Sequence, residues 1–312
     1  MIRSLVTATL LAVWAAPAAG QGGAVMITPA TPAPGAVVRV SFDDANRSGD
    51  AAVAVRGSMA GEQLHFVYAG NGVWRALGGV PVDATDSVVA RLSMERASGV
   101  VDTARAIVAL PRARAAAPPR RLAVADRFTQ PLDSATQARI ARENRRATEI
   151  GRRAHLTEPM WTAPFLQPRD SRVTSGFGSG RTFNGRATSR HLGVDFSGAV
   201  GAPVRAANRG IVALVDTFFL AGRVIYIDHG AGVMTGYFHL SEQIVSAGDT
   251  VERGQRIGSV GESGRVTGPH LHWSARYGAL AVNPLDLVAA GGWYGSALTP
   301  PDSGREGDES GQ

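Results

Sequence analysis

The first third of the chain is a series of short apolar runs rich in β-branched residues, interrupted by glycine, proline and asparagine. Four of these runs cover residues 37–42, 51–55, 65–68 and 107–110. Strand-length runs separated by turn residues are typical of a small antiparallel sandwich. We therefore predict a β-sandwich-like domain over residues 24–110, in which His65 is a strand residue and not a metal ligand.

A linker follows, and it contains one predicted helix. Residues 113–119 are mainly alanine and proline, and after them Asp133, Ser134 and Gln137 form the N-cap pattern of a helix that we expect to end at about Arg153. Its apolar stripe is thin and consists of Leu132, Ala135, Ile140, Ala147 and Ile150. A helix with such a narrow apolar face lies on a surface or bridges two domains. We therefore assign residues 111–160 to a linker with a basic helix.

The pattern changes again after residue 161, where short β-branched strands alternate with glycine-containing turns up to about Leu287. This pattern predicts a compact, antiparallel β domain over residues 161–290. The tail, residues 296–312, combines prolines with scattered acidic residues and is predicted to be disordered. The chain as a whole is therefore expected to be mainly β.

Residues 1–20 have the three parts of a secretory signal: Arg3 near the start, an apolar run from Leu5 to Ala16, and small residues before Gln21. The apolar run is short for a bilayer span, although a retained membrane anchor is the alternative. No later segment is apolar enough to cross a membrane. We expect export to the periplasm, the cell envelope or the outside, with no integral membrane span after cleavage.

The basic residues are concentrated in one segment. Between Arg112 and Arg153 there are eleven arginines against four acidic residues, while the whole chain has a formal charge of +6. Such a segment could bind an anionic cell-wall polymer, a lipid surface or nucleic acid. We favour a solvated helix face, because the chain has no lysine and arginine is its only basic residue. An anionic wall polymer is kept as the alternative partner, and no nucleic acid partner is expected.

The chain has no cysteine, so any metal must be bound through nitrogen and oxygen. Five of the seven histidines lie between His191 and His272. His191 and Asp195 are four residues apart, and Gly193 between them favours strand and loop over helix. In extended structure, positions four apart share a face, so both side chains can reach one ion.

His270 and His272 form the second cluster, two residues apart in a predicted strand, so both rings point to the same side. A catalytic zinc takes three protein ligands and leaves a fourth position for water. His191, Asp195 and one histidine of this pair would complete the ligand set. The other histidine of the pair, together with His239, could move a proton and steady the oxyanion. Spacing alone does not decide which histidine of the pair is the ligand.

At these residues the sequence closely resembles the lysostaphin and LytM type zinc endopeptidases, which cut the peptides of peptidoglycan. The resemblance covers about residues 168–287. Its motifs, in chain order, are Ser175-Gly-Phe-Gly178, His191-Leu-Gly-Val-Asp195, Gly201-Ala-Pro-Val-Arg-Ala206, Asp228-His-Gly230, Tyr237-Phe-His-Leu240, Gly248-Asp-Thr-Val-Glu-Arg-Gly254 and Thr267-Gly-Pro-His-Leu-His272.

The resemblance implies roles for five residues of these motifs. His191, Asp195 and His272 would bind a single Zn²⁺, and His239 and His270 would be the catalytic pair. It also implies the fold of that family, the duplicated hybrid motif, with the site in a groove, and peptidoglycan stem peptides as the substrate. His229 matches a family histidine too, but it enters a turn directly from a strand, and we interpret it as structural.

The sequence excludes two other functions and leaves a third open. Residues 248–258 are also similar to lipoyl and biotinyl carrier domains, but those domains need a lysine and this chain has none. The His-Glu-x-x-His string of helical zinc proteases is absent as well. The serious alternative is a catalytically silent scaffold that binds the wall or activates another wall hydrolase. Because all five family positions are intact, we favour an active zinc endopeptidase.

Overall fold

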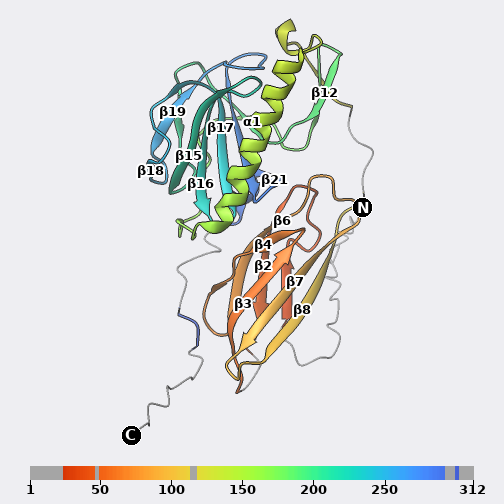
Figure 1. Ribbon diagram of the computed structural model, residues 1–312, viewed down its shortest axis with the longest axis vertical. Helices are drawn as coiled ribbons and strands as arrows, with labels where there is room; N and C mark the ends of the chain where they lie inside the picture. Colours follow the sequence, from red (N-terminus) through yellow and green to blue (C-terminus); the bar gives the residue numbers. More distant parts are fainter. Residues whose placement is uncertain (1–23, 46–48, 113–117, 292–298, 302–312) are drawn as a thin grey trace, which may run out of the picture.

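The computed structural model describes residues 24–45, 49–112, 118–291 and 299–301 (Figure 1). The predicted signal, residues 1–20, lies outside these ranges, and so does most of the predicted tail. The described chain is built mainly of antiparallel strands, which confirms the predicted fold class. No helix in these ranges is long and apolar enough to cross a membrane.

The N-terminal part consists of two four-stranded sheets. The first has the order β1 (Ala24–Thr28), β2 (Val37–Asp43), β6 (Val73–Gly79), β5 (Val67–Tyr68), and the second has the order β4 (Glu62–Leu64), β3 (Ala52–Met59), β7 (Ser87–Arg96), β8 (Val101–Ala109). Phe42 and Trp74 of the first sheet share one buried cluster with Met59 and Met94 of the second. His65 lies between β4 and β5, so its assignment to a strand is wrong.

The C-terminal part is organised around a ten-stranded sheet in which every pair of neighbours is antiparallel. Its main path is β10 (Val173–Ser175), β13 (Val194–Ser197), β20 (His270–Tyr277), β17 (Val233–Gln243), β16 (Gly222–Gly230), β15 (Gly210–Phe218), β18 (Thr250–Val251). The remaining strands are β19 (Arg256–Val260) on β17, β14 (Pro203–Arg205) on β19, and β21 (Leu280–Val282) on β20, and the helix α2 (Pro284–Ala289) follows β21. Trp273, Tyr237 and Phe196 lie in the core of this part, all fully buried.

The linker adds a strand to a small separate sheet of order β12 (Ala187–Arg190), β11 (Gly180–Phe183), β9 (Arg120–Leu122). The strand β9 runs parallel to β11, whereas β11 and β12 are antiparallel. Asn184 at the end of β11 holds the linker in place, because its amide exchanges hydrogen bonds of 2.9–3.0 Å with the backbone of Val124. The linker is therefore part of the surface beside β11. The short 3-10 helix η1 (Asp126–Phe128) follows β9 in the chain.

The long helix α1 (Ser134–Arg153) crosses the ten-stranded sheet diagonally (Figure 1). Asp133 is its N-cap, as the sequence predicts, and accepts a hydrogen bond of 2.6 Å from the Thr136 amide. The residues that α1 buries are Glu143, Ala147 and Gly151, one on each successive turn. At Gly151 a Cβ would lie 2.1 Å from the carbonyl oxygen of Gly278, so only glycine allows the helix to approach the sheet there.

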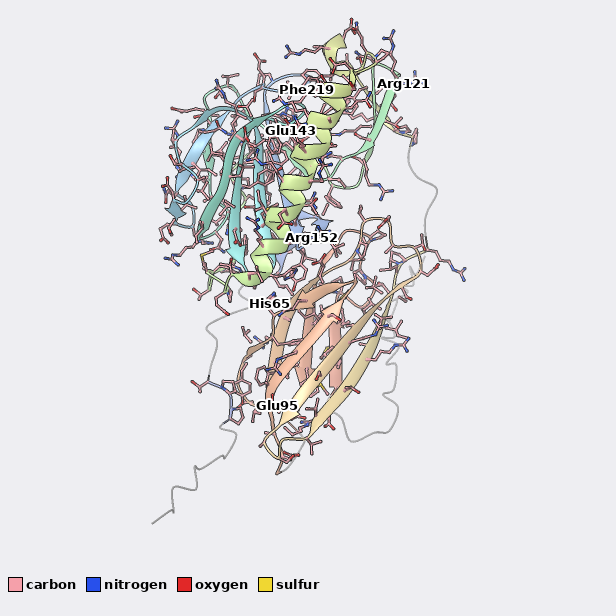
Figure 2. All side chains as sticks on the ribbon, in the orientation of Figure 1. His65, Glu95, Arg121, Glu143, Arg152 and Phe219 are labelled. Carbon is pink, nitrogen blue, oxygen red and sulfur yellow. The ribbon has the colours of Figure 1, made fainter. Side chains whose placement is uncertain are left out.

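The two parts of the chain contact each other at one end of the ten-stranded sheet. Asp286 of α2 accepts a hydrogen bond of 3.0 Å from the Val37 amide, and Tyr277 donates one of 2.7 Å to the carbonyl of Gln63. His155 of the short 3-10 helix η2 (Ala154–Leu156) lies 2.8 Å from both Glu62 and His65. Figure 2 shows His65 and the end of α1 at this junction.

Candidate metal and catalytic site

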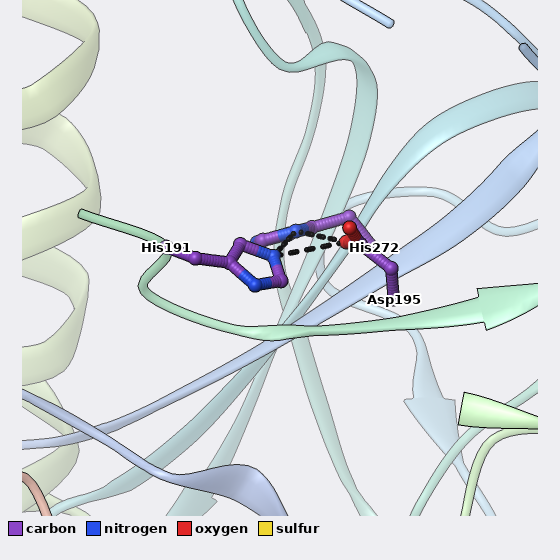
Figure 3. Close-up of side chains that lie close together, drawn as sticks. All are labelled: His191, Asp195 and His272. Carbon is purple, nitrogen blue, oxygen red and sulfur yellow. Dashed lines mark hydrogen bonds and ion pairs between the residues drawn. The ribbon is translucent and has the colours of Figure 1, made fainter. Parts of the chain in front are cut away.

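The register of β13 against β20 brings the two clusters together. Asp195 is the direct cross-strand partner of His272, and Ser197 is the partner of His270. Cross-strand partners present their side chains on the same face of a sheet, and positions two apart on one strand do so as well. His270, His272 and Asp195 therefore face one side, and the loop between β12 and β13 adds His191 from a neighbouring direction (Figure 3).

A turn at residues 175–179 holds His191 in place. The His191 backbone exchanges hydrogen bonds with this turn, accepting from the Gly178 amide at 2.7 Å and donating to the carbonyl of Ser179 at 2.8 Å. Its Nδ1 lies 2.8 Å from the carbonyl oxygen of Gly176. A carbonyl can only accept, so Nδ1 carries the proton and the Nε2 lone pair is free. The Ser175-Gly-Phe-Gly178 motif thus fixes the tautomer of His191.

Three potential ligand atoms converge at this point. His191 Nε2 lies 3.0 Å from Asp195 Oδ1 and 3.0 Å from His272 Nδ1, and these last two atoms are 2.8 Å apart. All three residues are buried, with at most 9% of each exposed. Gly193 makes room for the His272 ring, since a Cβ there would lie 2.5 Å from its Nε2.

This donor set fits a zinc ion. Two imidazole nitrogens and one carboxylate oxygen are the ligand types of a catalytic zinc, and three atoms this close together can each lie at roughly 2 Å from one ion beside their plane. Burial lowers the pKa of His272 to about 4, although the nearby carboxylate of Asp195 acts in the opposite direction. The ring is therefore neutral at neutral pH, which is the form that binds a metal.

The carboxylate of Asp195 divides its two oxygens between different partners. Oδ1 faces the two histidines, while Oδ2 accepts a hydrogen bond from Nη2 of Arg181, a nitrogen that also lies 2.8 Å from Ser175 Oγ. Burial alone would raise the pKa of Asp195, but the neighbouring rings of His191 and His272 hold it well below its ordinary value. Asp195 is therefore an anion whose orientation Arg181 fixes.

His239 and His270 form a second pair beside these three residues. Their ring centroids are 4.9 Å apart, and His270 Nε2 lies 3.8 Å from Asp195 Oδ1. His239 Nδ1 lies 2.8 Å from the carbonyl oxygen of Ser263, and His270 Nδ1 lies 2.8 Å from that of Gly268. Each carbonyl requires a protonated Nδ1, so in the neutral ring Nε2 is a proton acceptor.

The backbone of His239 has a φ of 61°, in the left-handed region that residues other than glycine seldom occupy. This conformation occurs inside the long strand β17, where a register irregularity separates the pairings on either side. Burial lowers the pKa of His239 well below its ordinary value, and the neighbouring His270 and His272 lower it further. His239 is therefore neutral at neutral pH.

The other histidine of the family motifs, His229, has both ring nitrogens occupied by protein groups. Nδ1 donates to the carbonyl of Arg209 at 2.8 Å, and Nε2 lies 2.8 Å from the hydroxyl of Thr235. The ring is fully buried, and burial lowers its pKa to about 4. These contacts agree with our interpretation of His229 as structural.

Sequence reasoning does not single out Arg181, which the fold places against Asp195. If Arg181 orients the carboxylate, Arg181→Met should weaken zinc affinity by about 10- to 100-fold, the usual effect of losing a hydrogen-bond partner of a ligand. A competition titration against a zinc-binding dye measures this, with Arg186→Met in the exposed turn after β11 as the matched control. Equal binding by Arg181→Met would mean that Arg181 has no net effect on the metal site, and tighter binding would mean that its repulsion of the metal outweighs its orienting effect.

Comparison with known proteins supports the same region of the chain. The model of the family described as "Peptidase family M23" matches residues 189–284, a range that contains all five of these site residues. Peptidoglycan DD-endopeptidase ShyA of Vibrio cholerae is 43% identical over 95 residues, which are 30% of this chain and 22% of that protein. The chain therefore spans less than a quarter of this curated relative.

Two solved structures are similar as well. A crystal structure from Pseudomonas aeruginosa, assigned to peptidase M23, is 26% identical with a TM-score of 0.62 and covers 83% of this chain and 96% of that one. The catalytic domain of lysostaphin from Staphylococcus simulans is 30% identical over 38% of this chain and 92% of that one, with a TM-score of 0.35. The match of the family model confirms the resemblance predicted from the motifs: residues 189–284 are a domain of peptidase family M23.

Proposed function

We propose that this protein is a zinc-dependent endopeptidase that hydrolyses peptide cross-links or bridges of peptidoglycan. One observation carries the proposal: within the M23 domain, a His-Asp-His donor set lies beside two histidines whose Nε2 atoms are free to accept protons. The relative ShyA is named a peptidoglycan DD-endopeptidase, which supports the choice of substrate. In this proposal His191, Asp195 and His272 bind one Zn²⁺, and His239 and His270 are the catalytic residues.

Bound zinc would supply Lewis-acid chemistry, polarising a carbonyl and lowering the pKa of a water molecule. The chain's own contribution is proton transfer. A ring with its proton on Nδ1 can accept a second one only at Nε2, and both His239 and His270 are in that state. The ring that accepts the proton becomes a cation and can then donate from Nε2 to the developing oxyanion or the leaving amine.

A catalytically silent scaffold that binds the wall or activates another hydrolase is the alternative. Such a protein could keep the metal donor set without hydrolytic activity. We do not favour it, because His239 and His270 are both close to the donor set and both have the tautomer that proton transfer needs.

The proposed location is the cell envelope after export, since the substrate of the named relative is peptidoglycan. A further proposed partner is an anionic wall polymer on helix α1, where Arg142, Arg145 and Arg152 are exposed. Not every arginine of this helix is available, because Arg146 forms an ion pair of 2.5 Å with Asp216.

The test of the proposed function is the release of soluble peptides from purified peptidoglycan by the full chain, together with its zinc content. We expect about one zinc per chain. Peptide release should stop when a chelator removes the metal and return when zinc is added back. Bound zinc without any release of peptides would favour the scaffold alternative.

A further inference from the structure

A cavity of about 280 Å³ opens directly beside the candidate site. Asp195 and His270 form part of its wall, and Arg181, Phe183 and Thr267 form another part. The linker strand β9 closes one side with Arg120 and Leu122. The cavity therefore borders both the metal donor set and the catalytic pair, where a substrate peptide must lie.

The wall of this cavity carries an excess of positive charge. Three arginines line it, Arg120, Arg181 and Arg265, against the single carboxylate of Asp195. Arg181 already neutralises that carboxylate. The cavity thus presents two further guanidinium groups without an acidic partner in its wall.

Arg265 is the more enclosed of the two remaining groups. Its guanidinium carbon lies 3.8 Å from the centre of the Phe183 ring, which fixes it against the cavity wall. Within the described ranges, no carboxylate or carbonyl accepts a hydrogen bond from its side chain. Burial and the neighbouring charge of Arg181 lower its pKa to about 10. An anion that enters the cavity would therefore stabilise the charged form of Arg265 and would be attracted by it.

We propose that Arg265 is a substrate-binding residue that pairs with a carboxylate of the peptide next to the bond that is cut. The inference rests on the proposed function, because it concerns the substrate of that site. A planar guanidinium can form two parallel hydrogen bonds to a carboxylate, which gives orientation as well as affinity. A bridge made only of glycine offers no side-chain carboxylate. The preferred substrate is therefore a cross-link between stem peptides that carries a free carboxylate beside the scissile bond.

The first experiment measures binding without catalysis. The probes are a cross-linked stem-peptide dimer with a free carboxylate beside the scissile bond and the same dimer with that carboxylate converted to the amide. Calorimetry on the metal-free full chain should give about 10- to 100-fold tighter binding of the acid form, the range expected for hydrogen bonds to a charged group. Arg265→Gln should bind both dimers with equal affinity, and Arg265→Lys should keep part of the preference.

The second experiment measures hydrolysis of the same two dimers by the zinc-loaded enzyme. Arg265→Gln should raise KM for the acid dimer and change kcat much less, because the residue binds the substrate and does not take part in the chemistry. Arg186→Gln, an exposed arginine in the turn after β11, is the control and should behave as wild type. Thermal unfolding of each variant shows whether loss of the contact with Phe183 has changed the fold.

Two results would overturn the inference. One is a wild-type protein that binds and cuts the amide dimer as well as the acid dimer. The other is an Arg265→Gln variant whose affinity falls by the same factor for both dimers, so that the preference for the acid dimer remains. That result would make Arg265 a structural residue. Failure of the proposed function is distinguishable: the zinc-loaded enzyme would cut neither dimer, whatever the metal-free chain binds.

Discussion

The His272→Ala variant is expected to lose its bound zinc and with it nearly all hydrolytic activity. His272 Nδ1 is the closest neighbour of Asp195 Oδ1, at 2.8 Å, and without it only His191 and Asp195 are left to hold the metal. Two ligands do not complete the set of three that a catalytic zinc uses. Since a catalytic metal contributes several kcal/mol to hydrolysis, the proposed function predicts that peptide release should fall by about 10³-fold or more.

The same variant should also lose the stabilisation that zinc gives to the fold. A metal that binds the native state alone raises the free energy of unfolding by about 4 kcal/mol when its concentration is 1,000 times the dissociation constant. Addition of zinc should therefore raise the melting temperature of the wild type and leave that of His272→Ala unchanged.

His65→Asn is a suitable control for both measurements, because His65 lies at the junction of the two parts and its hydrogen-bond partner is His155. This control should keep about one zinc per chain and respond to added zinc as wild type does. If His272→Ala kept its zinc at wild-type affinity, the assignment of His272 as a ligand would be wrong.

Much of the site could be predicted from the sequence because its residues lie close together in pairs. The spacing of His270 and His272 places both on one face, and the structure shows both rings on the side that Asp195 also faces. Spacing could not decide which of them is the proposed ligand, since positions two apart on a strand face the same side. The difference arises from the register, in which Asp195 pairs with His272 and not with His270.

Arg181 and Arg265 could not be predicted as parts of the site, since neither contact is local in sequence. Arg181 reaches Asp195 because the strand β11 pairs with β12 and with the linker strand β9. Arg265 meets Phe183 from a segment more than eighty residues away. Each arginine does lie within three residues of a quoted motif, Arg181 after Gly178 and Arg265 before Thr267, but this closeness does not reveal what the side chain contacts.

The helix α1 could also be predicted only in part, because tertiary contacts decide which of its residues are buried. Its N-cap at Asp133 is a local pattern and appears as predicted. Its buried face follows the predicted stripe only in part: Ala147 is buried and Leu132, Ile140 and Ile150 are half-buried, but Ala135 is exposed and the acidic Glu143 is buried. The reason is tertiary, because the Glu143 carboxylate accepts a hydrogen bond of 2.9 Å from the Phe219 amide in the turn between β15 and β16 (Figure 2).

The second large effect is expected for His270→Ala, which should lower kcat by about 10²- to 10⁴-fold, the usual contribution of a general acid or base. Its zinc content should stay close to one ion per chain. His270 Nε2 lies 3.8 Å from Asp195 Oδ1, farther than either proposed histidine ligand, and its Nδ1 is held by Gly268. The measurements are kcat on a defined cross-linked peptide and the metal content of the same preparation.

His239→Ala and the double variant test whether His239 and His270 act together. If the two rings share one proton-transfer step, each single variant should lose nearly as much activity as the double variant, because residues that act as a unit are not additive. Independent roles would instead lower the activity of the double variant, relative to wild type, by the product of the two single effects. Loss of zinc in His270→Ala would contradict the assignment in another way, since it would make His270 a metal ligand and leave His239 as the one residue available for proton transfer within the proposed pair.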